Sequence, residues 1–392
     1  MTKIIWVLAL FFCINAAAEE KQIFSAWLKD LKAEAKAAQI SPKTIKKTFK
    51  NAKLMPRVIV LDRAQPEFIS PFLSYVDARV TAGSVKQGRN LLQTHDALLT
   101  QIELKYGVPK QVLLAFWGLE THYGSNKGDF GLPSSLMTLA YDGRRAQFFR
   151  NQLLDAMRIV DAGHNTVAGL RGSWAGAMGQ MQFMPSTMLK YGVDADADGR
   201  INIISSLPDA FASAANYLAN VGWRKHEPTA LEVKLPANFD YSQAQLLVRK
   251  NAAEWAQLGV LQIDDSPLPS LENTAILLPQ GWQGPVFLVA SNFDVVMDWN
   301  RSVNYALSVS HLANQLIENK PILGGAEAEK AGMTFNQMWA LQAKLNLLGY
   351  DCGPPDGFPG LKTQVAIRQY QAKNNLPQDG YASINLYQAL IN

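Results

Sequence analysis

Cysteine is scarce in this sequence of 392 residues. Cys13 lies in an apolar run at the N-terminus, and Cys352 lies near the other end of the chain. Removal of that apolar run would leave one thiol, which excludes an intramolecular disulfide. The stability of the fold must then come from its core, with a bound metal ion as the other candidate source.

Charge is also sparse. Charged residues make up 18% of the chain, and the formal net charge is +4. Nucleic-acid-binding domains concentrate more basic charge than this on one face. Hydrophobic residues make up 48%, which is typical of a globular protein and excludes both a disordered chain and a bundle of membrane helices. We therefore expect a globular protein with no nucleic-acid partner.

The N-terminal apolar run covers residues 4–14, follows Lys3 and precedes small residues and two glutamates. This order is typical of a secretory signal peptide, and the run is too short for a comfortable membrane span. We predict cleavage after Ala18 and a periplasmic protein that does not span the membrane; a permanent membrane anchor is the alternative. Phe12 precedes Cys13, where lipid attachment requires a small residue, so a lipoprotein is not expected.

Hydrophobic periodicity predicts a mainly α fold. Helical spacing runs through residues 19–226, where Gly-rich turns interrupt its second half, and returns in residues 301–318. Residues 228–298 instead alternate and are rich in proline, which predicts a small β-containing subdomain. We assign residues 19–320 to one domain on this basis.

The last part of the chain has the pattern of a separate module. Residues 321–332 contain Pro and Gly-Gly and are predicted to be a linker. Residues 333–392 show helical stripes separated by two Asp-Gly turns. A domain this small has a thin core, so we expect a three-helix bundle.

Glu120 is the candidate catalytic residue. The segment 106–124 predicts an apolar helix, with Pro109 in its first turn and Gly124 just past its end. Glu120 then lies in the last turn, where the helix dipole and the apolar neighbours both disfavour the charged carboxylate. A raised pKa is what a general acid requires near neutral pH. The alternative is a surface glutamate near a helix end.

A second segment, residues 171–187, combines glycine and alanine with polar and aromatic side chains. The small residues permit close approach of the backbone. Gln180 and Gln182 could offer hydrogen bonds, and Trp174 and Phe183 could stack on sugar rings. A tight packing loop with aromatic core residues would have the same composition.

Taken together, the two segments resemble the B-type lytic murein transglycosylases, a lysozyme-like family. The resemblance covers roughly residues 24–318, and the ordered set of motifs is specific where one piece would be weak. The matching motifs are residues 120–124 (Glu-Thr-His-Tyr-Gly), 141–146, 176–186, 215–218, 222–223, 299–302 and 305–306.

The resemblance implies the chemistry of the site. Glu120 would protonate the oxygen between N-acetylmuramic acid and N-acetylglucosamine, and the substrate's own N-acetyl group would stabilise the cationic sugar. Glu120 would then take the proton of the muramoyl C6 hydroxyl, which closes a 1,6-anhydro ring without water. One carboxylate therefore suffices, whereas ordinary glycosidases use two.

The family's substrate-binding positions fall on six residues: Arg144, Arg145, Gln182, Phe183, Tyr217 and Asn300. The two arginines would pair with carboxylates of the substrate, although two solvated arginines at a helix start are the alternative. Tyr217 could equally belong to the core. His122 also lies in the motif and is expected to be structural.

Residues 194–203 resemble the start of an EF-hand loop, with carboxylates at positions 1, 3 and 5, Gly199 at position 6 and Ile201 at position 8. Position 12 is Ser205 in place of the usual glutamate, and Asn202 is expected to bond within the loop. The family carries an irregular loop of this kind that a later aspartate completes. The resemblance thus implies a structural Ca²⁺; the alternative is an Asp-rich turn without an ion. The predicted ligands are Asp194, Asp196, Asp198, Arg200 and Asp209.

Residues 334–391 resemble the peptidoglycan-binding domain 1 family. The resemblance rests on residues 341–342, 345–346, 349–350, 356–360, 363, 370–371, 376–377 and 379–381. It implies a wall anchor that raises the local substrate concentration; the alternative is a bundle that only packs on the catalytic domain. The expected partners are peptidoglycan glycan strands, other cell-wall enzymes stay open, and no organic cofactor is expected.

Two other functions remain open at this point. A hydrolytic muramidase would need a second carboxylate, for which Asp129 in the segment 127–131 is the candidate. A protein that only binds the wall would need no catalytic residue, and the intact glutamate motif argues against it.

Overall fold

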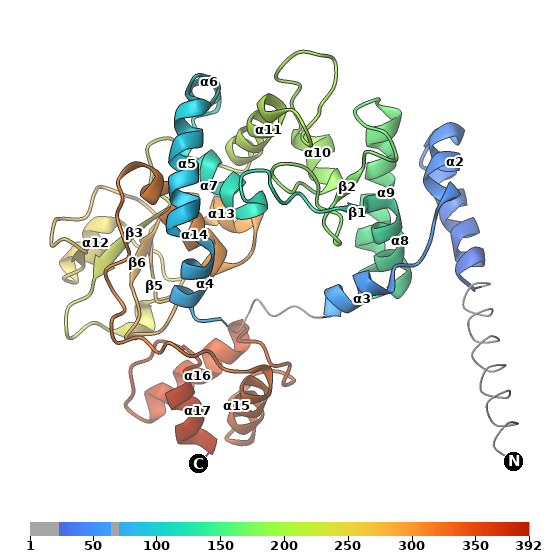
Figure 1. The fold of residues 1–392 in the computed structure, drawn as a ribbon. Coiled ribbons are helices and arrows are strands. Elements are labelled where there is room, and N and C mark those ends of the chain that lie inside the picture. The colour runs from blue at the N-terminus through green and yellow to red at the C-terminus, as the bar shows by residue number, and fades with distance from the viewer. Residues whose placement is uncertain (1–22, 64–69, 392) are drawn as a thin grey trace, which may run out of the picture. The chain divides into compact units, whose positions relative to one another are not determined.

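The computed structural model describes residues 23–63 and 70–391 of the chain (Figure 1). The predicted signal peptide and its cleavage site lie outside the described residues. The chain divides into two compact units. The first unit comprises residues 1–64 and 124–213, and the second comprises residues 65–123 and 214–392.

The first unit is helical with one small sheet. Its elements are a helix over residues 23–37, α2 (Pro42–Lys50), α3 (Pro56–Arg63), β1 (Phe130–Gly131), α8 (Leu132–Asp142), α9 (Ala146–Asp161), β2 (Arg171–Gly172) and α10 (Pro185–Tyr191). A further helix, α11 (Leu207–Asn220), begins in this unit and ends in the second. Strands β1 and β2 pair antiparallel.

Helices α8 and α9 form the centre of the first unit (Figure 1). Gly143, with a φ of 91°, ends α8 in the left-handed conformation and turns the chain toward α9. One face of α9 is buried at Phe149, Leu153 and Met157, a spacing of four residues that predicts such a face. Helix α2 packs on α9, and the Ser41 hydroxyl caps α2 by accepting the Thr44 N–H.

The second unit contains the remaining helices and a four-stranded sheet. Its helices are α4 (Phe72–Arg79), α5 (Ala82–Thr94), α6 (Asp96–Tyr106), α7 (Lys110–Thr121), α12 (Ala252–Gln257), α13 (Ser291–Trp299), α14 (Val303–Ile317), α15 (Phe335–Leu347), α16 (Leu361–Lys373) and α17 (Ile384–Ile391). A 3₁₀ turn lies at Tyr241–Gln243. Helix α14 packs against α4, α5 and α7. No helix in the described residues is long and apolar enough to cross a membrane.

The β-containing subdomain lies where the alternating pattern predicted it. Strands β3 (Ala230–Lys234), β4 (Leu261–Gln262), β5 (Ala275–Leu277) and β6 (Phe287–Val289) form an antiparallel sheet in the order β4-β3-β6-β5. Their inward side chains share a core with the fully buried Trp255 of α12. The prediction of a mainly helical fold with a small β-containing part is confirmed.

The C-terminal module is a bundle of α15, α16 and α17 around its own core, as expected (Figure 1). Two glutamines hold its two Asp-Gly turns in the same way. Gln342 donates its amide N–H to Asp356 and accepts the Gly357 N–H, and Gln371 does the same with Asp379 and Gly380. Asp356 is exposed, whereas Asp379 is buried.

The second of these turns docks on the β-containing subdomain. Asp379 Oδ2 accepts the backbone N–H of Trp282 at 2.8 Å. The segment before the module is also attached at both ends. Glu232 accepts the N–H groups of residues 323 and 324, and Glu329 caps the start of α17 by accepting the Ile384 N–H. The predicted linker therefore has no regular secondary structure but is bonded to its surroundings.

Candidate active site

Helix α7 carries Glu120 in its last turn and is buried over most of its length. Pro109 is its N-cap, and the helix ends at Thr121, with His122 at a φ of 49° and Tyr123 at 55°. The expectation that Gly124 lies just past the helix was therefore wrong by two residues. Beyond this end the Tyr123 ring packs on Gly118, where an added Cβ would lie 2.8 Å from that ring. His122 supports this turn through its backbone, whose N–H bonds to Gly118.

Two aromatic donors hold the carboxylate of Glu120. Its Oε1 accepts the indole N–H of Trp299 at 2.9 Å and the phenol O–H of Tyr305 at 2.5 Å. Trp299 is the last residue of α13 and Tyr305 lies in the first turn of α14, so these two helices position the side chain that α7 presents. Hydrogen bonds to an ionised carboxylate are stronger than neutral ones, so this pair fixes the orientation of Glu120.

The same donors belong to an aromatic cluster. The Trp299 ring lies 4.5 Å from Phe116, which is one turn before Glu120 on α7. Tyr217 of α11 meets Trp299 edge-on at 5.2 Å. Phe116 is fully buried, while Tyr217, Trp299 and Glu120 are partly exposed. The carboxylate is thus partly exposed beside an apolar wall.

Tyr305 stays a donor over the whole physiological range. Burial, followed by the negative charge of Glu120, raises the pKa of its phenol well above the usual value of 10. The phenol therefore remains protonated and cannot take the proton from Glu120. Its role is to hold and stabilise the carboxylate.

Asn300 lies next to this cluster in the chain. It is the C-cap of α13, and its N–H bonds to Val296 while its carbonyl accepts the Ser302 N–H at 2.7 Å. Among the predicted site residues of the second unit, the structure brings Tyr217 and Glu120 onto the same aromatic side chain, Trp299, and places Asn300 directly after it.

The glycine-rich segment of the first unit forms a tight loop, which its composition had left open as an alternative. Gly179 has a φ of 77°, and an added Cβ there would lie 2.5 Å from the Ile203 carbonyl oxygen. Gln182 also adopts a left-handed φ, of 49°, which is uncommon for a residue with a side chain. Its amide donates to the carbonyl oxygens of Lys127 and Gly179, and this holds the residue in place.

Phe183 and Trp174, the two aromatic residues of this loop that could stack on sugar rings, differ in exposure. The Phe183 side chain is only 3% exposed, so the idea that its ring offers a sugar-stacking face was wrong. Its backbone pairs with Met178 in both directions, which directs the ring into the interior. Trp174 is partly exposed. Gln180 is buried and donates to the Ile204 carbonyl oxygen at 3.2 Å, so its amide serves the fold.

Arg144 and Arg145 share one buried carboxylate, that of Asp62 on α3. Arg144 donates to both Asp62 oxygens at 2.7 Å, and Arg145 donates to Oδ1 at 3.0 Å. Burial raises the pKa of Asp62, but the hydrogen bonds and charges of the two arginines outweigh it and leave the pKa below 3.8. Both guanidinium groups remain about half exposed. The pair therefore presents one net positive charge, fixed in orientation.

Asp129, the candidate second carboxylate, forms an ion pair with Arg171. It is exposed and bonds to Arg171 across the β1–β2 pair, with Arg171 Nε 2.7 Å from Asp129 Oδ1. That hydrogen bond, followed by the charge of Arg171, lowers the pKa of Asp129 below 3.8. A lower pKa makes the carboxylate a weaker general base.

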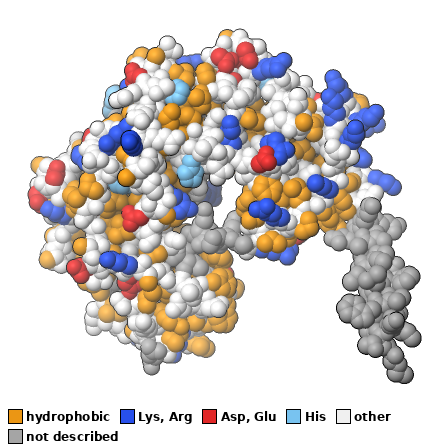
Figure 2. All heavy atoms as spheres, viewed as in Figure 1, with side chains coloured by type: hydrophobic (Ala, Val, Ile, Leu, Met, Phe, Trp, Pro, Cys, Tyr) orange, Lys and Arg blue, Asp and Glu red, His pale blue; other side chains and the backbone are white. Residues whose placement is uncertain are grey.

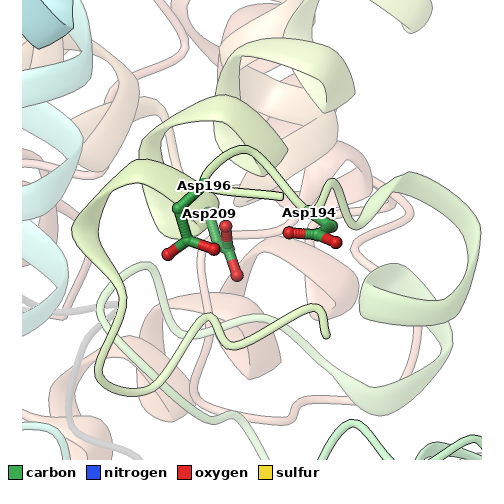
Figure 3. A group of neighbouring side chains, drawn as sticks. All are labelled: Asp194, Asp196 and Asp209. Atoms are coloured by element: carbon green, nitrogen blue, oxygen red, sulfur yellow. The ribbon is translucent and has the colours of Figure 1, made fainter. Parts of the chain in front are cut away.

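Three of the predicted metal ligands come together in the first unit. Asp194, Asp196 and Asp209 each offer an oxygen, and these oxygens all lie within 4.8 Å of one another (Figure 3). Asp209 is fully buried in the first turn of α11 and accepts the N–H groups of Ala195 and Asn202. Carboxylate oxygens grouped in this way suit a hard cation such as Ca²⁺.

The other two predicted ligands are not part of that group. Asp198 is exposed and its Oδ1 accepts the Arg200 N–H, so its side chain closes the turn. Arg200 occupies position 7, where EF-hand loops supply a main-chain oxygen; this contribution stays a prediction. Asn202 bonds to Ser205 through both ends of its amide, as expected for a residue that stabilises the loop.

The loop of residues 194–205, which carries all the predicted metal ligands except Asp209 and is called the metal loop below, is bonded to the glycine-rich loop of residues 171–187. The carbonyl oxygen of Ile203 accepts the backbone N–H of Gln180 at 2.9 Å, and that of Ile204 accepts the Gln180 side-chain amide. Gln182 is two residues further on. A cation bound to the aspartates would therefore also stabilise the loop that carries Gln182.

Reasoning from the sequence missed the two donors to Glu120. Trp299 and Tyr305 appeared only as parts of matching motifs and received no role. They lie 179 and 185 residues from Glu120 in the chain, so no spacing pattern connects them with it. The available signal was their chemistry, because buried tryptophan and tyrosine usually place their N–H and O–H groups on a partner.

The profiles of two protein families match the chain. The profile of the transglycosylase SLT domain matches residues 23–314, and that of a peptidoglycan binding domain matches residues 336–390. The first match covers well over half of the chain. The chain belongs to the transglycosylase SLT family.

The chain is also similar to individual proteins of known structure or name. The lytic transglycosylase SltB3 of Pseudomonas aeruginosa, solved with NAG-NAM-pentapeptide and with NAG-anhNAM-pentapeptide, is 39% identical, with TM-scores of 0.90 and 0.91 over 94% of this chain and 99% of that chain. Membrane-bound lytic murein transglycosylase B of Escherichia coli is 30% identical over 250 residues, which are 62% of this chain and 66% of that protein. The Escherichia coli lytic transglycosylase Slt35, solved with calcium, is 25% identical over 74% of this chain and 92% of that chain, with a TM-score of 0.65.

Proposed function

We propose that the protein is a lytic murein transglycosylase that cleaves the bond between N-acetylmuramic acid and N-acetylglucosamine in peptidoglycan. The observation that carries this proposal is the single carboxylate of Glu120, held at Oε1 by Trp299 and Tyr305 in a chain of the transglycosylase SLT family. The relative SltB3 was solved with a peptide-bearing anhydro sugar, which is the type of product that this reaction forms.

The reaction needs Glu120 in two protonation states. The protonated carboxyl first gives its proton to the glycosidic oxygen as that bond breaks, and the substrate's N-acetyl oxygen stabilises the positive charge at C1. The carboxylate then removes the proton of the muramoyl C6 hydroxyl, whose oxygen bonds to C1. The proton returns to Glu120, no water is consumed, and a 1,6-anhydro end results.

Trp299 and Tyr305 support both states. Both donate to Oε1 of the carboxylate. Their hydrogen bonds strengthen when the carboxylate becomes charged. The chain therefore stabilises the charge that develops on Glu120 as its proton leaves.

The state of Asp129 argues against a hydrolytic muramidase. A hydrolase would need that carboxylate to activate water, whereas Arg171 is bonded to it and lowers its pKa. The transglycosylase route uses the C6 hydroxyl of the substrate in place of water. A single carboxylate is then sufficient.

We further propose how the substrate is bound. Tyr217 and Asn300 are assigned to the sugar, since Tyr217 is partly exposed on the aromatic cluster that holds Glu120. Gln182 is assigned to hydrogen bonds with the glycan. The net positive pair Arg144 and Arg145 is assigned to substrate carboxylates, which guanidinium groups bind well.

Ca²⁺ is the proposed structural ion. Asp194, Asp196 and Asp209 would hold it, and its chemistry would be the neutralisation of three negative charges. The fit rests on the donor set, because three carboxylate oxygens lie together with one of them fully buried. The relative Slt35 was solved with calcium.

The proposed organisation follows from these assignments. Residues 1–18 are the signal peptide of a periplasmic protein, and residues 19–320 are the catalytic domain with its β-containing part near 228–298. Residues 321–332 are the linker, and residues 333–392 bind the wall. The match of residues 336–390 to a peptidoglycan binding domain supports the last assignment.

Mass spectrometry of muropeptides released from purified peptidoglycan tests the reaction. Wild-type protein should release products about 18 Da lighter than those of a hydrolase, since water is not added. The Glu120→Gln variant should release none and should still bind the wall. Reducing-end products from the wild type would instead establish a hydrolase, and release by the variant would remove Glu120 from the reaction.

A further inference from the structure

A cavity lies in the first unit, and Glu120, Trp299 and Tyr305 are not among the residues that line it. It is open to solvent and has a volume of about 810 Å³. Four segments line it: α2 with its N-cap Ser41, the last two residues of α9, the loop 163–169 that follows, and residues 198–205 of the metal loop. Ligand pockets for small molecules and peptides have volumes of about 300–1,000 Å³, so the cavity has room for several residues of a peptide.

Three cationic side chains converge on this cavity. Lys43 and Lys47 are one turn apart on α2 and therefore share a face of that helix, and Arg200 reaches the cavity from the metal loop. Within the part of the chain that the structure describes, none of the three forms an ion pair. Figure 2 shows lysine and arginine side chains gathered over α2, which contains four lysines and no acidic residue.

The two carboxylates on the cavity wall are already engaged. Asp161 accepts the backbone N–H and the hydroxyl of Ser41, and although burial raises its pKa, these hydrogen bonds leave the pKa below 3.8. Asp198 accepts the Arg200 N–H. Three cationic and two anionic side chains give the cavity lining one net positive charge. The two carboxylates already accept hydrogen bonds from the protein itself.

The walls of the cavity are bonded to one another. Ser41 connects α2 to the end of α9 through Asp161, and His164 Nδ1 accepts the Ile201 N–H at 3.1 Å, which connects the loop 163–169 to the metal loop. Because Nδ1 is an acceptor, the neutral imidazole of His164 carries its proton on Nε2, a donor. The cavity is thus a formed site with fixed walls.

We propose that this cavity binds the peptide of peptidoglycan through its carboxylates. The inference rests on the proposed function, because it takes its ligand from the same substrate, whose peptide is present in both complexes of the relative SltB3. Cations on two separate segments of the lining suit a ligand with several separated carboxylates better than one compact anion. A peptide held there would tether the protein to a strand independently of Glu120.

The metal loop gives this site a second property. Arg200 and Asn202 line the cavity, and the aspartates on the same loop are the proposed Ca²⁺ ligands. Ordering of that loop by Ca²⁺ fixes one wall of the cavity in advance. Binding of the two ligands is therefore linked, and each raises the affinity for the other by the same factor.

Calorimetric titration of the full chain tests the proposal. The probe is the free pentapeptide L-alanyl-γ-D-glutamyl-meso-diaminopimelyl-D-alanyl-D-alanine, and the double variant Lys43→Gln, Lys47→Gln should bind it at least about tenfold more weakly. The matched control is Lys46→Gln, Lys50→Gln, which removes the same charge at the same spacing from α2 but outside the cavity lining. Arg200→Gln should weaken binding by a similar factor.

Three results would overturn the proposal. These are no binding of the peptide to the wild type, an equal loss in the control pair, and inorganic phosphate that competes as well as the peptide, which would indicate a general anion site. Removal of Ca²⁺ should weaken peptide binding, and an unchanged affinity would remove the link to the metal. Cleavage of peptide-free glycan strands, assayed in parallel, reports on the proposed function alone, because the Lys43→Gln, Lys47→Gln variant should cleave them as the wild type does.

Discussion

Glu120 and Asp209 are two carboxylates held by hydrogen bonds, yet the donors described for them differ in kind. Glu120 accepts from the side chains of Trp299 and Tyr305, which lie 179 and 185 residues away. Asp209 accepts from two backbone N–H groups, at residues 195 and 202 of the preceding loop. One site is assembled by the tertiary fold, and the other by a short stretch of chain.

This difference in donors fits the proposed roles of the two residues, metal binding by Asp209 and proton transfer by Glu120. Backbone N–H groups cannot withdraw without unfolding the loop, so Asp209 suits a fixed ligand in a structural centre. Aromatic side chains place their N–H and O–H groups at Oε1 of Glu120 and surround it with apolar rings. A carboxyl group in such surroundings can exchange a proton while its position stays constant.

The largest effect is expected at Glu120. The Glu120→Gln variant keeps the size of the side chain and the bonds at Oε1 but cannot donate and then accept a proton. Turnover of purified peptidoglycan should fall by at least about 10³-fold. Glu272→Gln, at an exposed loop position, is the matched control and should cleave at the wild-type rate. Activity retained in Glu120→Gln would assign the proton transfer to another group.

Tyr305→Phe removes one of the two donors and leaves the ring. The value of kcat should fall by about 10- to 100-fold with KM nearly unchanged, because the lost bond stabilises charge that develops only during the reaction. Tyr106→Phe, in the same unit but without a role at Glu120, is the control. A change in KM alone would show that Tyr305 acts through substrate binding.

Asp209→Asn tests the locally built centre. An amide group would turn an N–H toward one of the two backbone donors, and the loss should be about 2 kcal/mol of unfolding free energy. Added Ca²⁺ should raise the Tm of the wild type and should no longer do so in this variant. Asp198→Asn, outside the group of three, should keep the response to Ca²⁺. If Asp198→Asn also lost it, that aspartate would be a ligand after all.

The smallest effect is expected at Asp62, whose pKa the two arginines lower. A carboxyl group with a depressed folded-state pKa contributes stability above its unfolded value, here 3.8, and loses that contribution as the pH falls through the folded value. The two guanidinium groups are half exposed, so the contribution is about 1 kcal/mol. Thermal unfolding from pH 7 downward should show a wild-type advantage over Asp62→Asn that is constant above pH 3.8 and shrinks below it. A difference that stayed constant below this pH as well would assign the effect to packing.

The same contrast explains what could be predicted from the sequence. The β-containing subdomain, helix α14 and the C-terminal bundle follow from local periodicity, because the pattern of apolar residues decides which face is buried. The grouping of Asp194, Asp196 and Asp209 was also predictable. The three aspartates and the backbone N–H groups that bond to Asp209 all lie within residues 194–209.

Features that depend on distant partners were out of reach. The sequence contains no pattern that pairs Asp62 with Arg144, 82 residues away, or that directs the Phe183 ring inward. Nor does a sequence pattern show that α7 ends at Thr121, with His122 in the left-handed conformation and the Tyr123 ring packed on Gly118. Side-chain partners of this kind are chosen by packing across the whole unit, which a local window of sequence does not contain.

The two Asp-Gly turns of the C-terminal module have a mechanical consequence. One turn is exposed at Asp356, and its counterpart at Asp379 is bonded to Trp282 of the sheet-containing part. With the connecting segment bonded at Glu232 and Glu329 as well, the joint has little slack. A flexible connection would limit only the distance between the module and the sheet-containing part, whereas a connection bonded at several points also limits their relative orientation. A wall strand gripped by the module would therefore set the angle at which the rest of this unit is presented to it.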